Sequence, residues 1–170
     1  MSVQFRLAGT DDAVALSRLG AETFTETFGH LYQPADLALF LTTHGEEHWR
    51  QELADPEFAV LIAESDAGEA VGYAKIGPPH LPFEPRGTAV ELRQFYLLEP
   101  WQGQGLAGQM MEWVIDEAER RGGKDLYLSV FVDNHRARKF YERWGFVAEG
   151  RYAFMVGSHA DEDVVMRRPL

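Results

Sequence analysis

The sequence contains no cysteine among its 170 residues. A disulfide framework, a thiolate metal site and a cysteine nucleophile are therefore excluded. Basic residues are also few, with 16 Lys and Arg against 27 Asp and Glu and a formal net charge of −11. Because phosphate contacts require a basic face, this balance argues against nucleic acid as the main partner. An acidic protein instead attracts cationic small molecules.

Long hydrophobic runs are absent as well. No apolar stretch approaches the length of a membrane span, and the N-terminus is polar without the apolar core of a signal peptide. These features predict a cytoplasmic protein without a membrane partner. The 45% hydrophobic content suits a single globular domain over residues 1–170. The oligomeric state stays open, and a homodimer is one option.

Hydrophobic periodicity predicts a mixed α/β domain. The expected strands cover residues 3–7, 58–64, 70–75, 89–98, 126–132, 146–154 and 163–168, and the expected helices cover 10–28, 34–42, 46–53, 106–121 and 134–144. Thr10 is expected to cap the first helix, and Pro34 suits the first turn of the second. The proline-rich residues 77–87 are expected to form an exposed loop, and residues 157–161 the last turn.

The chain is organised around a glycine-rich stretch, residues 101–108, between a strand and a helix. Gly103, Gly105 and Gly108 let the backbone adopt positive φ and approach a bulky anion closely. The free N–H groups of the helix N-terminus and its dipole favour negative charge. The stretch therefore predicts a phosphate or pyrophosphate site, with a simple flexible turn as the alternative.

Three kinds of phosphate-binding loop are candidates for a stretch with these glycines. A Walker loop is excluded because the stretch lacks its Gly-Lys-Ser/Thr ending. The dinucleotide fingerprint G-x-G-x-x-G is present, but it comes late, with too little chain after it for a doubly wound sheet. The acetyltransferase pattern Gln-x-x-Gly-x-Gly/Ala is matched by Gln102, Gly105 and Ala107. The loop alone does not decide between the last two.

A second motif follows a strand's length downstream. The pattern Asn-x-x-Ala-x-x-Phe-Tyr-x-x-x-Gly-Phe is matched at Asn134, Ala137, Phe140, Tyr141, Gly145 and Phe146. With both motifs in this order, the chain resembles the GCN5-related N-acetyltransferase (GNAT) superfamily from about residue 3 to the C-terminus. The resemblance implies the GNAT fold, in which helices flank a central, twisted, mixed and mostly antiparallel sheet. It also implies transfer of an acetyl group from acetyl-CoA to a primary amine by direct attack, without a metal.

The resemblance assigns the glycine-rich stretch to the pyrophosphate of acetyl-CoA and the backbone of the preceding strand to its pantetheine arm. The residues expected to bind acetyl-CoA are Phe95, Tyr96, Leu97, Gln102, Gly103, Gln104, Gly105, Leu106, Ala107, Gly108, Asn134, Phe140 and Tyr141. Asn134 also suits a helix N-cap, and the two roles are compatible.

Two catalytic residues are expected. The resemblance places Tyr141 beside the thioester sulfur as the general acid for the leaving thiolate; a core aromatic is the alternative. An alkylamine with a pKa of about 10.4 is neutral only about once in two to three thousand molecules at pH 7, so a base would help. Glu91 matches the position of the base in several relatives. Alternatively, Glu91 faces solvent and pairs with Arg93.

A histidine string, His44-Gly-Glu-Glu-His48, has the i, i+4 spacing of a helical metal pair. Gly45 weakens a helix there and no third ligand is evident, so two surface histidines are expected rather than a zinc site. Residues 136–143 are basic but alternate with aromatic and acidic residues. This alternation indicates a solvated helix face, or a contact for the phosphates of CoA.

The acceptor is less specified. The resemblance places it between the first two helices and the last hairpin, where acids and aromatics suited to an organic cation occur. The residues expected to bind it are Glu22, Phe24, Glu26, Phe28, Tyr32 and Tyr152. Residues 21–28 and 152–157 look similar to bacterial enzymes that acetylate polyamines such as spermidine. A protein or peptide N-acetyltransferase and a non-catalytic acyl-CoA-binding sensor are the alternatives.

Overall fold

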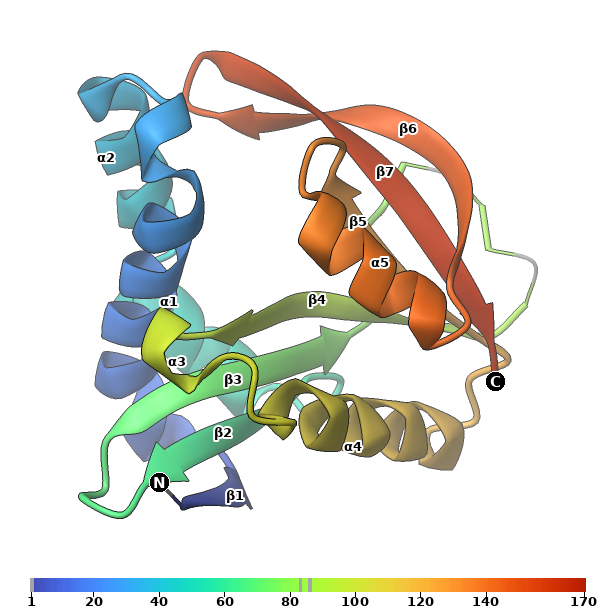
Figure 1. Cartoon of the computed structure of the whole chain (residues 1–170), viewed down its shortest axis with the longest axis horizontal. Coiled ribbons are helices and arrows are strands. Elements are labelled where there is room, and N and C mark those ends of the chain that lie inside the picture. The colour runs from blue at the N-terminus through green and yellow to red at the C-terminus, as the bar shows by residue number, and fades with distance from the viewer. Residues whose placement is uncertain (1, 83, 86) are drawn as a thin grey trace.

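The computed structural model describes residues 2–82, 84–85 and 87–170, without the side chain of residue 43. Its framework is a seven-stranded sheet of order β1-β2-β3-β4-β5-β7-β6 (Figure 1). The strands are β1 Val3–Leu7, β2 Ala59–Ser65, β3 Ala70–Gly77, β4 Ala89–Leu97, β5 Asp125–Phe131, β6 Val147–Val156 and β7 His159–Pro169. Only β4 and β5 pair in parallel. The expected mixed, mostly antiparallel sheet is confirmed.

Helices cover both faces of the sheet. They are α1 Ala13–Phe28, α2 Pro34–Thr43, α3 Glu46–Ala54, α4 Leu106–Arg120 and α5 His135–Arg143, with short 3-10 turns η1 Thr10–Asp12, η2 Gly29–Leu31 and η3 Glu99–Trp101. In Figure 1, α4 and α5 lie on the near face, and α1 and α3 lie against the other side. None of the helices in the described ranges is long and apolar enough to cross a membrane.

Two hydrophobic cores hold these layers. On the α4–α5 face, Met110 and Val114 pack with Leu126 and other apolar side chains of the sheet. On the opposite face, Leu16 of α1 and Trp49 of α3 belong to a smaller core with side chains of β2 and β3. Each fully buried side chain of this size contributes about 1.5–3 kcal/mol. The alternation of buried side chains along the strands therefore separates two chemically distinct faces.

Strand β4 carries a bulge in the middle of the sheet. Lys75 of β3 pairs with Gln94 and Ile76 pairs with Leu92, so Arg93 is the extra residue on β4. A bulge of this kind reverses the side-chain alternation along the strand. As a result Leu92 packs into the α4 core, and so does Phe95, three residues further on.

The tip of the β6–β7 hairpin is attached to α2, as Figure 1 shows at the top. The Oδ1 atom of Asp36 accepts hydrogen bonds from the backbone N–H and the hydroxyl of Ser158, both at 2.9 Å. Gly157 has a φ of +60°, and a Cβ atom added to it would overlap Asp36. This contact closes the space between the first helices and the last hairpin.

Two expectations about element boundaries were wrong. Thr10 does not cap the first helix: it begins a 3-10 turn, in which the Asp12 carboxylate accepts the Gly9 N–H at 2.8 Å. Asp12 also pairs with Arg6, which fixes this turn to β1. The last two strands are longer than expected, and the turn between them comprises only residues 157–158. Cross-strand pairing thus carries residues 159–161 into the sheet, where local composition indicates a turn.

Candidate active site

The sheet splits between β4 and β5. Parallel pairing joins residues 89–91 to 125–127 and stops there. Beyond that point β4 still pairs with β3, and β5 still pairs with β7. The two facing edges therefore carry backbone N–H and C=O groups that no neighbouring strand satisfies. Such edges can receive an extended ligand as an added strand.

The glycine-rich stretch lies at the end of β4, where α4 begins. Gly103 and Gly105 have φ values of +78° and +82°, which residues with a Cβ atom adopt only at a cost. A Cβ atom at either position would meet no described atom within 4 Å, so the loop faces open space. Gly105 is the N-cap of α4, and the N–H groups of the first helical turn lack acceptors within the helix. The expected positive φ is confirmed for these two glycines.

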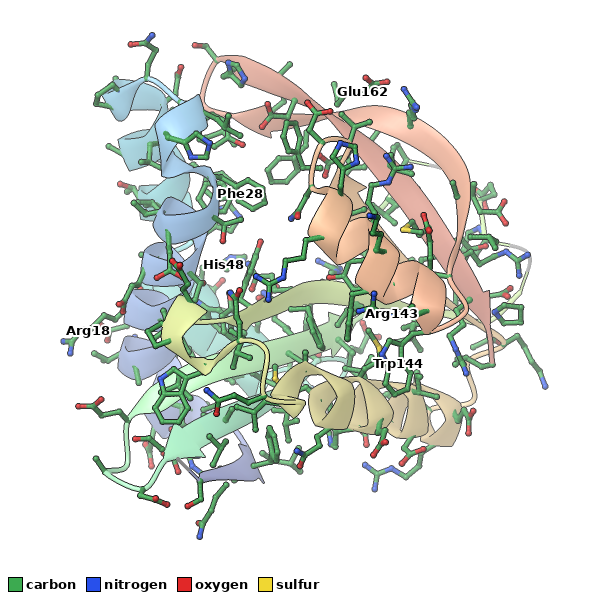
Figure 2. All side chains as sticks on the ribbon, viewed as in Figure 1. Arg18, Phe28, His48, Arg143, Trp144 and Glu162 are labelled. Carbon is green, nitrogen blue, oxygen red and sulfur yellow. The ribbon has the colours of Figure 1, made fainter. Side chains whose placement is uncertain are left out.

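Gly108 differs from the other two, because it is helical. A Cβ atom there would lie 3.6 Å from Cζ2 of Trp144. This is an ordinary contact distance, so the approach of α4 to α5 does not depend on a glycine at this position. Figure 2 shows Trp144 beside α4.

The side chain of Gln102 holds the loop in place. Its Nε2 donates to the Leu97 carbonyl at 2.8 Å, and its Oε1 accepts from Nη1 of Arg136 at 2.7 Å. The amide thus links the end of β4 to the first turn of α5. Gln104 binds within the loop, with its Nε2 3.1 Å from the Pro100 carbonyl.

Aromatic side chains line the near side of the split. Phe95 stacks on Phe140 at 5.8 Å between centroids, and Tyr141 contacts Phe95 edge-on at 6.3 Å. Tyr141 is 8% exposed, and its burial raises the pKa of the phenol far above its ordinary value. The phenol therefore keeps its proton at neutral pH. Asn134 caps α5 by accepting the Ala137 N–H at 3.3 Å, so its capping role is confirmed.

Glu91 lies at the point where the strands separate, and only 2% of it is exposed. Its carboxylate accepts the backbone N–H of His80 at 2.9 Å, and Nδ1 of His80 lies at 2.8 Å. Nε of Arg93 lies 3.6 Å from Oε2 of the same carboxylate. The solvent-facing alternative for Glu91 is wrong, whereas the expected pairing with Arg93 is present. The carboxylate ties His80, which follows β3, to the sheet.

The opposite face of the split, called the second face from here on, is bordered by rings from α1, from α2 and from the segment between these two helices. Phe24 stacks on Tyr32 at 5.9 Å and on Phe40 at 4.4 Å between centroids. Phe28 meets Phe131 of β5 edge-on at 6.2 Å, and Figure 2 shows Phe28 pointing away from α1 toward that strand. Three of the expected acceptor residues thus form one aromatic cluster.

Hydroxyls and carboxylates complete this second face. The Tyr32 hydroxyl donates to Asp161, and the Tyr152 hydroxyl donates to Ser129 Oγ at 2.9 Å. Asp163 is 6% exposed, and burial raises its pKa to about 7. Neither aspartate was expected at the site. Their spacing of two is a possible signal, but the expected turn over residues 157–161 separates Asp161 from the strand that begins at Asp163.

The two expected glutamates of α1 have different surroundings. Glu22 is exposed. Glu26 accepts the backbone N–H of Glu99 at 2.9 Å, at the start of η3. Glu26 thus links α1 to the turn before the glycine-rich stretch.

A small pocket lies between the first three helices and β4. Its lining includes Gly20, Phe24, Phe40, Trp49, Gln94 and Tyr96. The Oε1 atom of Gln94 is buried, and within the described part of the chain it has no hydrogen-bond partner. Sequence reasoning missed this polar group, because only the bulge turns Gln94 toward the pocket.

Within the described residues, no group of three His, Asp or Glu side chains that could hold a metal ion occurs at the histidine string. His44 is half-buried rather than a surface residue. Its Nδ1 lies 2.8 Å from the Phe40 carbonyl, and its ring stacks on Phe40 at 4.2 Å. Burial lowers the pKa of His44.

A split between parallel strands, a glycine loop at its mouth and a buried tyrosine beside it are the features that the resemblance to GNAT enzymes implies for this region. The chain belongs to the acetyltransferase (GNAT) family, whose model matches residues 21–146. The family and the fold that the sequence motifs indicated are therefore confirmed.

The chain is similar to relatives with different acceptors. An uncharacterized N-acetyltransferase of Mycobacterium tuberculosis is 32% identical over 94% of this chain and 98% of its own. A spermine/spermidine N(1)-acetyltransferase of Bacillus subtilis is 35% identical over 51% of this chain and 59% of its own. The L-amino acid N-acetyltransferase AaaT of Escherichia coli is 32% identical over 69% of this chain and 74% of its own.

Among solved structures, the PaiA N-acetyltransferase of Thermoplasma acidophilum in complex with coenzyme A has a TM-score of 0.80. It is 16% identical and covers 100% of both chains. The likeness shows that the whole chain shares this fold.

Proposed function

We propose that this enzyme transfers the acetyl group of acetyl-CoA to a primary amine of a small organic cation. One observation carries the proposal: the second face of the split combines aromatic rings with buried carboxylates. Rings and carboxylates are the groups that recognise an ammonium ion. Spermidine and related polyamines have this chemistry.

On the near face, the loop of Gly103 to Gly108 would hold the pyrophosphate with backbone N–H groups. The open edge of β4 near Phe95 and Leu97 would pair with the pantetheine arm, and an N–H there would polarise the thioester carbonyl. Acetyl-CoA supplies the activated acyl group and the thiolate leaving group. Tyr141, protonated and buried, would give its proton to that thiolate.

The similar proteins support two kinds of acceptor, a polyamine and an amino acid. The charges of the second face favour the polyamine. An amino acid would bring its carboxylate close to Asp161 and Asp163, and like charges in a buried site repel. A polyamine brings only positive charge, and its remote ammonium groups can reach further carboxylates.

A thiol-release assay with acetyl-CoA tests this proposal on the unmodified protein. Spermidine, butylamine, an L-amino acid and a peptide with a free N-terminus are compared at equal ionic strength. We expect kcat/KM for spermidine to exceed that for butylamine by about tenfold, as for one additional ion-pair contact of about 1.4 kcal/mol. The advantage should shrink with salt, because exposed charges are screened over about 10 Å at 0.1 M.

The other outcomes are decisive as well. Equal kcat/KM for spermidine and butylamine would remove the polyamine and leave acetyl transfer intact. Faster reaction of the L-amino acid or the peptide would replace the cation with that acceptor. Tight CoA binding without thiol release for any amine would indicate a non-catalytic sensor.

A further inference from the structure

The ammonium group of a bound acceptor must lose a proton before it attacks, and the obvious carboxylate is engaged. Glu91 accepts two hydrogen bonds from His80, and Arg93 lies next to it. The oxygens of Glu91 are thus already occupied by donors of its own chain. Asp163 of β7 is a further buried carboxylate, and it lies on the second face.

Strand register places Asp163 on that face. On β7, Asp163 is opposite Phe131 of β5 and Tyr152 of β6. Side chains alternate along a strand, so Asp163 shares a face with Ser129, two residues before Phe131. The neighbours in sequence, Glu162 and Val164, point the other way: Val164 is in the α4–α5 core. Figure 2 shows Glu162 directed outward at the edge of the hairpin.

Groups from five elements face Asp163. The hydroxyls of Tyr32, Tyr96 and Tyr152 come from the segment after η2, from β4 and from β6. Burial raises the pKa of each of these tyrosines, and the negative charge of Asp163 adds to the shift. Asp161 is the charged neighbour on β7, and its pairing with Tyr32 and His159 holds it to one side. Ser129 of β5 interacts with Asp163 and partly lowers its pKa. Around Asp163 these groups are hydroxyls and one like charge.

Burial raises the pKa of Asp163 to about 7, with the charge of Asp161 as the second cause. An ordinary aspartate has a pKa of about 3.9 and holds a proton far more weakly. A base is most effective when its pKa lies near the working pH, because it is then both ionised and able to take a proton. Asp163 meets this condition, and it also lies opposite the face that carries Tyr141.

We propose that Asp163 binds the ammonium group of the acceptor and accepts the proton that the amine must lose. This inference rests on the proposed transfer to an amine. Asp163 acts as a catalytic residue in it, because its carboxylate touches the reacting nitrogen. Glu91 then has a positioning role, through its hydrogen bonds to His80.

The step balances as follows. An N–H bond of the ammonium breaks and an O–H bond forms on Asp163, which leaves a lone pair on nitrogen. That lone pair forms the C–N bond to the acetyl carbon, and the C–S bond breaks with its electrons on sulfur. The thiolate takes the phenolic proton of Tyr141, and the second proton leaving nitrogen restores the phenol through solvent. Asp163 releases its proton to water, so one proton is liberated per turnover.

The pH dependence of kcat/KM tests the proposal with spermidine as the probe. In the unmodified enzyme we expect a plateau between about pH 7.5 and 9.5, because Asp163 supplies the base throughout this range. In Asp163→Asn we expect a loss of about 100-fold at pH 7. The remaining activity should rise about tenfold per pH unit, since it depends on the free amine in solution. Acetyl-CoA affinity by calorimetry should be unchanged, because Asp163 lies on the other face from the loop.

Two matched variants accompany this one. Glu162→Gln removes a carboxylate from the same strand, where it is exposed and paired with Arg151, and it should leave the profile unchanged. Glu91→Gln should lower the rate without changing the position or slope of the profile. An Asp163→Asn enzyme that keeps the plateau and stays within threefold of wild type at pH 7 would overturn the proposal. A wild-type profile without a plateau would overturn it too, while acetyl transfer itself would stand.

Thermal stability separates catalysis from structure. Because the folded-state pKa of Asp163 is raised, its protonated form is favoured by folding, and this contribution is lost as pH rises through about 7. In Asp163→Asn the side chain is neutral at every pH, so folding never buries a charge at this position. Its Tm should therefore equal or exceed that of the wild type at pH 8, with a smaller difference at pH 5. A large fall in Tm at both pH values would mark Asp163 as structural and contradict the proposal.

Discussion

Replacing Tyr141 by Phe should separate a catalytic phenol from a packed ring. The variant keeps the aromatic contacts with Phe140 at 5.7 Å and Phe146 at 5.8 Å. It removes only the hydroxyl, for which the described residues show no hydrogen-bond partner. Stability should therefore change by no more than about 0.5 kcal/mol, or roughly 1–2 °C in Tm for a chain of this size.

The effect on the rate should be much larger. General-acid catalysis contributes about 10²-fold at its lower limit, which corresponds to about 2.7 kcal/mol of transition-state stabilisation. We therefore expect kcat to fall about 100-fold in a thiol-release assay at saturating acetyl-CoA. Acetyl-CoA affinity should be nearly unchanged, because a proton given only in the transition state does not contribute to ground-state binding.

A second buried tyrosine provides the control. Tyr73 is fully buried on the opposite face of the sheet, within the core of α1, α3, β2 and β3. Tyr73→Phe removes a hydroxyl from an equally buried ring and should keep kcat within about twofold of wild type. A Tyr141→Phe enzyme with wild-type kcat from pH 6 to 9 and an unchanged Tm would refute the general-acid role.

Two further substitutions test the loop and the hairpin. Gly105→Val should weaken acetyl-CoA binding at least about tenfold by calorimetry, because φ is +82° there and a side chain would enter the space before the loop. The control is Gly68→Val, at φ +80° in the β2–β3 turn. It carries the same strain and should leave the affinity for acetyl-CoA unchanged. Gly157→Ala should displace Asp36 and lower the free energy of unfolding in urea by about 1–3 kcal/mol. It should also raise KM for the amine but not KM for acetyl-CoA. A wild-type KM for the amine in a destabilised variant would show that the hairpin tip does not shape the acceptor site.

The order of the helices and strands was predictable from the sequence, because it depends on local signals. Alternation marks the strands, Pro34 starts α2, and Gly105 and Gly145 lie at helix ends with positive φ as their positions suggested. The two family motifs also located both sides of the split. These signals need only neighbours in the chain.

The chemistry of the second face was not predictable in the same way. Asp161 and Asp163 enter the site because β7 pairs with β5 as far as Asp163 and with β6 as far as His159, and cross-strand register decides this. Glu91 interacts with His80, which lies in a proline-rich stretch. The sequence of this stretch has no periodic pattern from which its course could be predicted. Pairing between distant residues is fixed by burial and geometry, which local composition does not contain.

The bulge at Arg93 shows how much one residue can decide. Before it, Val90 and Leu92 face the α4 core and Glu91 faces the other side; after it, Phe95 faces the core and Tyr96 the other side. Without the extra residue, Phe95 would point away from α5 and Tyr96 would point toward it. The ring that packs against Tyr141 and the hydroxyl that faces Asp163 would then exchange places. In the proposed transfer, the bulge would give β4 a face toward acetyl-CoA and a face toward the acceptor on the same short segment.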